Sequence, residues 1–80
     1  MYWHKVSEKL PPKCYTILLS GVIKETFENK LESRRIYQVG TLEKANNRLY
    51  WQYSGPFVKY LDETEGVIFD YWAEIPPVIE

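Results

Sequence analysis

The chain has 80 residues, of which 16% are aromatic, and its formal net charge is −1. Eighty residues are enough for one domain, because a second hydrophobic core would have too few residues to build it. The basic residues are scattered apart from the pair Arg34-Arg35, which excludes the broad basic surface that grips nucleic acid. We therefore expect no nucleic-acid partner.

Cysteine use and hydropathy bear on the cellular compartment. Cys14 is the only cysteine, so no disulfide can form within the chain. The start of the sequence lacks the apolar stretch of a secretory signal, and the longest apolar run, Ile17–Leu19, is far shorter than a membrane span. We therefore expect a cytoplasmic protein with no membrane partner.

The first predicted elements are a strand and a helix. Residues 14–21 are rich in strand formers and end at a glycine, which indicates a buried strand. In residues 22–35 apolar side chains recur at positions i, i+4 and i+8, the spacing of an amphipathic helix. These side chains are Ile23, Phe27 and Leu31. We predict a short helix here, with an extended hairpin as the alternative because β-branched residues are present and no proper helix cap precedes the segment.

The remaining elements are predicted to be antiparallel strands. Residues 35–44 and 47–54 are strand-like, and the turn residues Lys44–Asn47 between them favour a hairpin. Within the second strand Leu49, Trp51 and Tyr53 alternate with polar neighbours, so one face packs and the other is wet.

Two more strands follow, at residues 57–61 and 67–74. Simple alternation in the last strand places Phe69 and Tyr71 on one face and Trp72 on the other, which indicates a central strand or an edge open to a partner. Pro76-Pro77 then ends the pairing. The sequence thus predicts one small α+β domain over residues 1–80, with an antiparallel sheet of about four strands and one short helix; an all-β fold is the alternative.

Patterns that carry catalytic or metal chemistry are weak. His4 and Cys14 are the only histidine and thiol, and their spacing does not support a nucleophilic pair. The acidic run at residues 62–65 lacks the alternating acids and central glycine of a calcium loop, and the glycines form no phosphate-binding motif. We therefore expect no enzyme activity, no cofactor and no metal site.

The two ends of the chain carry a resemblance. The start has Trp3 followed by Val6-Ser7-Glu8-Lys9-Leu10-Pro11, then the strand Thr16–Leu19, and the end reads Tyr71-Trp72-Ala73-Glu74-Ile75-Pro76. This pattern resembles the domain-of-unknown-function family numbered 551, a group of short proteins common in phages and prophages. The family usually has His where this chain has Tyr71 and Leu where it has Ile75, and residues 22–35 look like an insertion.

The resemblance implies a phage accessory protein that binds a host protein in the cytoplasm of a bacterium and inhibits a host enzyme or a defence system. The motif also has a structural interpretation, in which Trp3 and Trp72 pack together while the prolines fix the backbone at both ends. The residues of this structural motif are Trp3, Leu10, Pro11, Trp72, Ile75 and Pro76.

The candidate partner-binding residues are tyrosines, because tyrosine combines a large contact area with a polar tip. They are Tyr50, Tyr53, Tyr60 and Tyr71. The alternative function is a small-ligand module in which the aromatic cluster encloses a nucleotide-like ring. A homodimer is a further expectation, because an unpaired strand edge invites symmetric pairing.

Overall fold

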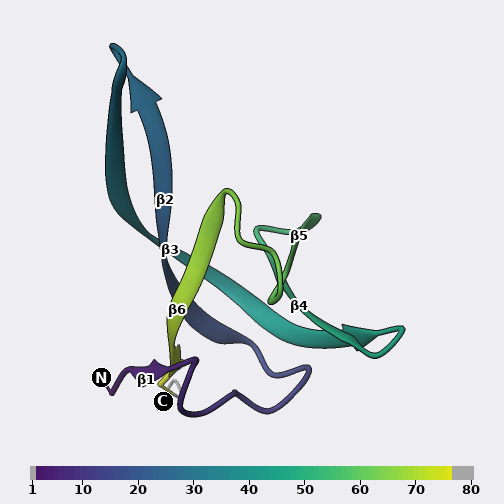
Figure 1. The fold of residues 1–80 in the computed structure, drawn as a ribbon. Coiled ribbons are helices and arrows are strands. Elements are labelled where there is room, and N and C mark those ends of the chain that lie inside the picture. The colour runs from purple at the N-terminus through teal and green to yellow at the C-terminus, as the bar shows by residue number, and fades with distance from the viewer. Residues whose placement is uncertain (1, 77–80) are drawn as a thin grey trace.

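The fold is a single sheet of antiparallel strands, seen in a computed structural model that describes residues 2–76 (Figure 1). Within these residues the sheet has six strands in the order β1-β6-β2-β3-β4-β5. The strands are β1 (His4–Lys5), β2 (Ile17–Phe27), β3 (Lys30–Ala45), β4 (Arg48–Tyr53), β5 (Phe57–Tyr60) and β6 (Val67–Glu74). Pairing of the last strand ends at Glu74, before the expected stop at Pro76, and Pro77 lies outside the described residues.

The sheet curls because β3 pairs with different strands along its length. Its first part, from Lys30 to Gly40, pairs with β2, and its second part, from Gly40 to Ala45, pairs with β4. A Cβ atom on Gly40 would lie 2.4 Å from the carbonyl oxygen of Gln52, so only glycine fits at this crossing. The ribbon shows the far part of the β2–β3 hairpin projecting away from the rest of the molecule (Figure 1).

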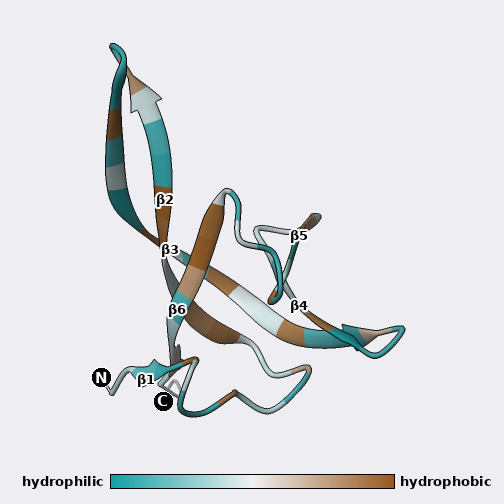
Figure 2. Cartoon of the chain, in the orientation of Figure 1, coloured by the Kyte–Doolittle hydropathy of each residue, from teal (hydrophilic) through white to brown (hydrophobic). Residues whose placement is uncertain are grey.

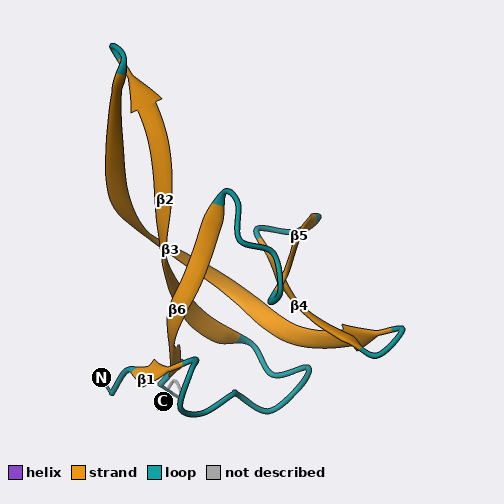
Figure 3. Cartoon of the chain, in the orientation of Figure 1, coloured by secondary structure: helices purple, strands orange, loops and turns teal. Residues whose placement is uncertain are grey.

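The predicted α+β class is wrong, because no helix occurs among residues 2–76 and the all-β alternative is what the chain forms (Figure 3). Residues 22–35 form the alternative hairpin, from Val22 opposite Arg35 to Phe27 opposite Lys30. The turn residues Glu28 and Asn29 have φ values of 50° and 64°. Two consecutive residues with positive φ match the two-residue turns that join antiparallel strands, and they interrupt any helix.

Other sequence predictions are confirmed. The second hairpin turns at Asn46 and Asn47, which have φ values of 51° and 62°. Trp51 in β4 is buried, with Leu49 and Tyr53 packed against the core on the same side. The predicted last strand matches β6, and it is central because it lies between β1 and β2. Residues 2–76 contain no helix that is long and apolar enough to cross a membrane.

The core lies on one face of the curled sheet, which we call the inner face. Figure 2 shows hydrophobic segments concentrated in β2, the middle of β3 and β6. The buried apolar side chains are Ile17, Leu19, Leu42, Trp51, Val67, Phe69 and Trp72. Such a sheet has a single packed layer of side chains, so the opposite face, which we call the outer face, is left to solvent or to a partner.

A β-bulge in β6 corrects the predicted alternation. Ser20 of β2 lies opposite Tyr71, whereas the next residue, Gly21, lies opposite Phe69, so Asp70 is the extra residue. In the bulge Asp70 and Tyr71 both point to the outer face, so Phe69 and Trp72 on either side of them both point to the inner face. The simple alternation had assigned them to opposite faces. Asp70 and Tyr71 lie on the outer face, where they meet Arg35.

Candidate functional site

The outer face of β2, β3 and β6 is an open apolar and aromatic surface. Register pairs place its side chains side by side, with Leu18 opposite Val39, and Val22 between Arg35 and Ile68. The outer-face cluster, as we use the term, consists of Trp3, Leu18, Val22, Arg35, Tyr37, Val39, Ile68, Asp70 and Tyr71. Its most exposed ring is Tyr37, which is 64% exposed although strand residues surround it. The ring of Trp3 lies against it, with the two ring centroids 6.0 Å apart, and most of Tyr37 stays in contact with solvent.

An ion pair that crosses one strand organises the centre of the outer-face cluster. Arg35 of β3 donates hydrogen bonds of 2.8 Å and 2.9 Å to the two carboxylate oxygens of Asp70 on β6. The guanidinium passes over β2, where it also donates a 2.8 Å hydrogen bond to the hydroxyl of the buried Ser20. These bonds fix the orientation of the guanidinium, since a bidentate pair restricts it more than a single contact does.

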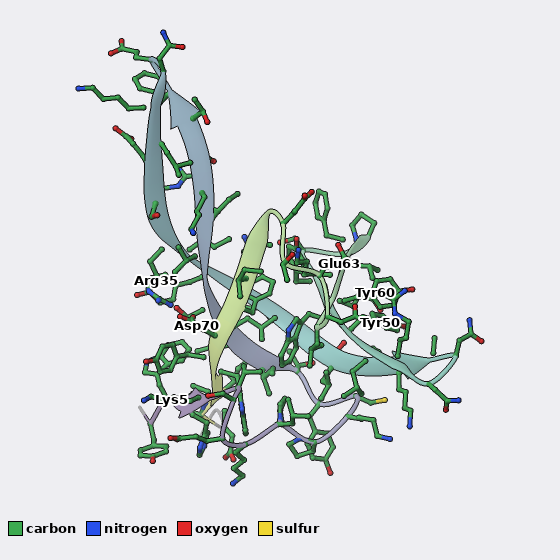
Figure 4. All side chains as sticks on the ribbon, in the orientation of Figure 1. Lys5, Arg35, Tyr50, Tyr60, Glu63 and Asp70 are labelled. Carbon is green, nitrogen blue, oxygen red and sulfur yellow. The ribbon has the colours of Figure 1, made fainter. Side chains whose placement is uncertain are left out.

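The electrostatics of the pair follow from this geometry. The hydrogen bond from Arg35, helped by its positive charge, lowers the pKa of Asp70, and partial burial of the carboxyl acts in the opposite direction. The same hydrogen bond raises the pKa of Arg35. Both groups are therefore charged at neutral pH. Figure 4 shows the two side chains directed toward each other across the sheet.

Aromatic rings flank the ion pair. The guanidinium carbon of Arg35 lies 5.5 Å from the centre of the Tyr71 ring, within the range of a cation–π contact. The rings of Trp3 and Tyr37 have centroids 6.0 Å apart. Together with Ser20, these four residues line a hollow of about 360 Å³. A second hollow, of about 340 Å³, lies on the other side of Tyr37, against Leu18 and Val39.

The sequence-predicted tyrosines do not form one surface. Tyr50 and Tyr60 lie on neighbouring strands β4 and β5, with ring centroids 5.6 Å apart. Arg48 sits 3.8 Å above the Tyr60 ring and forms a 2.7 Å ion pair with Asp62. Figure 4 places Tyr50 and Tyr60 well away from Arg35 and Asp70. These two rings are therefore a separate pair.

Tyr53 and Tyr71 lie in two further places. Tyr53 is on the inner side, with its ring 4.9 Å from Phe69 and 5.8 Å from Phe57. Burial raises the pKa of the Tyr53 hydroxyl, and the charge of Glu63 adds to the effect. Tyr71 is the one predicted tyrosine that belongs to the outer-face cluster.

The motif tryptophans have different neighbours from those that the sequence suggested. Trp72 is fully buried, stacks on His4 at 4.4 Å and donates a 2.7 Å hydrogen bond to the carbonyl oxygen of Lys9. Trp3 contacts Tyr37 on the outer face. The other motif residues differ in burial: Pro11 is buried, while Leu10, Ile75 and Pro76 are exposed.

The groups weighed for chemistry have structural partners. His4 stacks on Trp72, whereas the exposed Cys14 places its thiol 3.5 Å from a carboxylate oxygen of Glu43. The hydrogen bond to Glu43 raises the pKa of Cys14, which reduces the fraction of reactive thiolate. No cluster of three metal-ligating side chains occurs among residues 2–76.

Several outer-face residues were missed from the sequence. Arg35, Tyr37 and Val39 alternate in the sequence RIYQV, a signal of one strand face that could have been noticed. Their neighbour Tyr71 gave no such signal, because a bulge places it on the same face as Asp70.

No family model matches the chain, and neither the curated proteins nor the solved structures contain a significant match.

Proposed function

We propose that the chain is a small phage-type accessory protein that binds a host protein through its outer-face cluster. The observation that carries the proposal is the exposure of Tyr37, Val39 and Ile68 on the outer face, where they are 64%, 49% and 40% exposed. Contiguous apolar patches on the surface of a protein mark interaction sites, whereas single exposed apolar residues are normal and need no explanation.

The chemistry of the cluster fits a protein partner. Trp, Tyr and Arg are the residues that dominate binding energy at protein interfaces, and Trp3, Tyr37, Tyr71 and Arg35 supply all three types. The ion pair with Asp70 holds Arg35 in place before binding, so less side-chain entropy is lost when a partner docks. The partner is accordingly expected to present a flat surface with apolar groups for the rings and acceptors for the guanidinium.

The biological setting of the proposal rests on the resemblance of the two ends to the phage family. In that setting the binding would inhibit a host enzyme or a defence system inside a bacterial cell. A binding role, as opposed to catalysis, is supported by the separate partners of His4 and Cys14 and by the raised pKa of the thiol.

A second candidate function is supported by one observation. The hollow of about 360 Å³ between Trp3, Tyr37 and Tyr71 lies in the size range of small-ligand sites, and Ser20 and Arg35 add polar groups. A planar, nucleotide-like ring could stack there. We rank this second because Tyr37 is mostly exposed, whereas ligand sites usually enclose most of the ligand surface.

The test compares two tyrosines of nearly equal exposure. Tyr37 is 64% exposed and Tyr15, in the loop before β2, is 65% exposed. Tagged wild-type protein, Tyr37→Ser and Tyr15→Ser are used to capture proteins from a bacterial lysate. We expect one dominant host protein to be retained by the wild type and by Tyr15→Ser, and to be lost with Tyr37→Ser. Binding of the purified partner is then measured by calorimetry.

Other outcomes contradict the proposal in distinct ways. Equal retention by Tyr37→Ser and the wild type would place the contact elsewhere, and loss with Tyr60→Ser alone would move it to the Tyr50–Tyr60 pair. Capture of nothing, together with heat released when nucleotides are titrated into the wild type but not into Tyr37→Ser, would favour the ligand function.

A further inference from the structure

The far part of the β2–β3 hairpin, residues 22–35, which we call the arm, has an open strand edge. On the side of β6, pairing with β2 stops at Ile23, and on the side of β4, pairing with β3 begins only at Gly40. Between Lys30 and Val39, β3 therefore has β2 on one side and no described strand on the other. Figure 1 shows this stretch extending beyond the other strands. It is the longest unpaired edge in residues 2–76.

The backbone groups on this edge can be assigned from the register. The two-residue turn at Glu28-Asn29 makes Phe27 and Lys30 a hydrogen-bonded pair, and hydrogen-bonded pairs alternate with non-bonded ones along the hairpin. The residues of β3 with odd numbers therefore point their N–H and C=O groups to the open side. The relevant ones are Leu31, Ser33, Arg35, Tyr37 and Val39. A row of such groups is a template for another strand.

Charges on the inner-face side of the arm are unbalanced within one chain. Glu25 lies directly opposite Glu32, and like charges in that position destabilise a sheet. Arg34 forms a 3.0 Å ion pair with Glu25, which leaves no positive partner in contact with Glu32 among the described residues. The cation that Glu32 lacks can be supplied by a second chain on the open edge.

We propose that two copies of this chain pair antiparallel along the open edge of β3, with the two-fold axis at Ser33. This register sets Ser33 opposite Ser33 of the second copy and Glu32 opposite Arg34 of the second copy, and the symmetry repeats the charge pair. Glu32 and Arg34 occupy non-hydrogen-bonded positions, where opposing side chains come closest. Each Glu32 then gains a positive neighbour.

Repulsion between like charges disfavours the two neighbouring registers of the dimer. Moving the axis to Glu32 sets Glu32 against its own copy, and moving it to Arg34 sets two arginines face to face. In the Ser33 register the paired region runs from Lys30 to Ile36. It ends before Gln38, whose side-chain oxygen accepts a hydrogen bond from the Ser54 hydroxyl, so the β4–β5 turn stays clear.

The dimer does not depend on the function proposed above, but it affects how that function is presented. A two-fold axis perpendicular to the sheet keeps both outer faces on the same side. The two outer-face clusters would form parts of one continuous sheet surface, so a symmetric partner could contact both copies.

Charge exchange provides the first test. Glu32→Lys sets a lysine opposite Arg34 of the second copy, and Arg34→Glu sets a glutamate opposite Glu32, so each variant alone has two like-charge pairs. Each variant is expected to raise the dimer Kd by about tenfold or more at low salt. An equimolar mixture of the two variants has opposite-charge pairs across the heterodimer and should regain an affinity close to that of the wild type. Sedimentation velocity measures all three samples.

Crosslinking provides the second test and does not require a stable charge variant. In a Cys14→Ser background, Ser33→Cys should form an intermolecular disulfide under mild oxidation, because the two opposing Cα atoms would lie about 5.5 Å apart. Lys24→Cys is the matched control. Lys24 lies opposite Ser33 on β2, so the two copies of this residue would be three strand spacings apart, about 14 Å, and should not crosslink.

Three results would overturn the proposal. One is a wild-type monomer at all concentrations from micromolar to millimolar. Another is a dimer whose affinity the charge variants and their mixture leave unchanged. The third is crosslinking through Lys24→Cys at least as efficient as through Ser33→Cys, which would assign the contact to the edge of β2.

Discussion

The indole nitrogen of Trp72 donates a 2.7 Å hydrogen bond to the carbonyl oxygen of Lys9, and this bond joins β6 to the segment that follows β1. The same indole stacks on His4. One buried side chain thus connects the two regions of the chain that carry the sequence resemblance, and its partners are a backbone carbonyl and an imidazole.

Trp72 should be essential for stability. Trp72→Ala removes a fully buried ring and is expected to lower the free energy of unfolding by about 3–5 kcal/mol. Trp3→Ala is the matched control and should cost less, because Trp3 is only half-buried. Urea unfolding followed by circular dichroism measures both. Equal losses would show that burial does not distinguish the two tryptophans.

Gly40 should tolerate no side chain. Gly40→Ala is expected to destabilise the fold by about 1–3 kcal/mol, because its Cβ would press on the backbone oxygen of Gln52 and the strands would have to shift. Gly55→Asn is the control, since no atom lies within 4 Å of that position and Asn accepts the φ of 84°. Melting temperatures report the difference, and a stable Gly40→Ala would contradict the crossing geometry.

A substitution in the turn at Glu28-Asn29 should change the stability in opposite directions in a hairpin and in a helix. Replacing Glu28-Asn29 by Asn-Gly supplies the residues that a two-residue turn with two positive φ values prefers, and should stabilise the protein by about 0.5–1 kcal/mol. The same change in a helix would destabilise it by about 1 kcal/mol. Unfolding in urea gives the sign of the change in unfolding free energy. Gly55→Asn, in the turn between β4 and β5, serves as the control.

The Arg35–Asp70 pair should contribute a pH-dependent part of the stability. The pKa of Asp70 is lowered in the folded protein, so the contribution is complete above the unfolded pKa of about 3.9 and is lost as the pH falls through the folded pKa. Asp70→Asn lacks this contribution. The difference in unfolding free energy between wild type and Asp70→Asn should therefore be constant from pH 7 to about pH 5 and shrink below about pH 4.

The control for the pH experiment is Glu8→Gln, at an exposed carboxylate that forms no ion pair within residues 2–76. Its difference from the wild type should change little over the same range. A difference for Asp70→Asn that persists undiminished at pH 2.5 would mean that the carboxylate charge is not what stabilises the pair.

Part of the fold could be predicted from the sequence. The alternation around Trp51 and the Asn46-Asn47 turn are local signals, and both were interpreted correctly. The arm was misassigned because Ile23, Phe27 and Leu31 have helical spacing. In the hairpin Phe27 and Leu31 lie on strands either side of the Glu28-Asn29 turn, on opposite faces, and pairing across this turn decides the conformation.

The candidate site was harder to predict for a related reason. Arg35 and Asp70 are 35 residues apart in the sequence and meet across β2. Alternation places Asp70 on the face opposite Phe69, but only the bulge brings Tyr71 to that same face. Tyr71 was proposed for its residue type, but its neighbours could be found only once the order of the strands was known.

The position of β6 between β1 and β2 has a consequence for biosynthesis. β6 is the last of the six described strands to leave the ribosome, yet it fills a central place in the sheet and brings Phe69 and Trp72 to the core. Until it emerges, β1 has no partner and the inner face of β2 is incomplete. The sheet therefore cannot be completed while β6 is still in the ribosome. Because the last contacts to form join residues far apart in the sequence, we expect this final folding step to be slow.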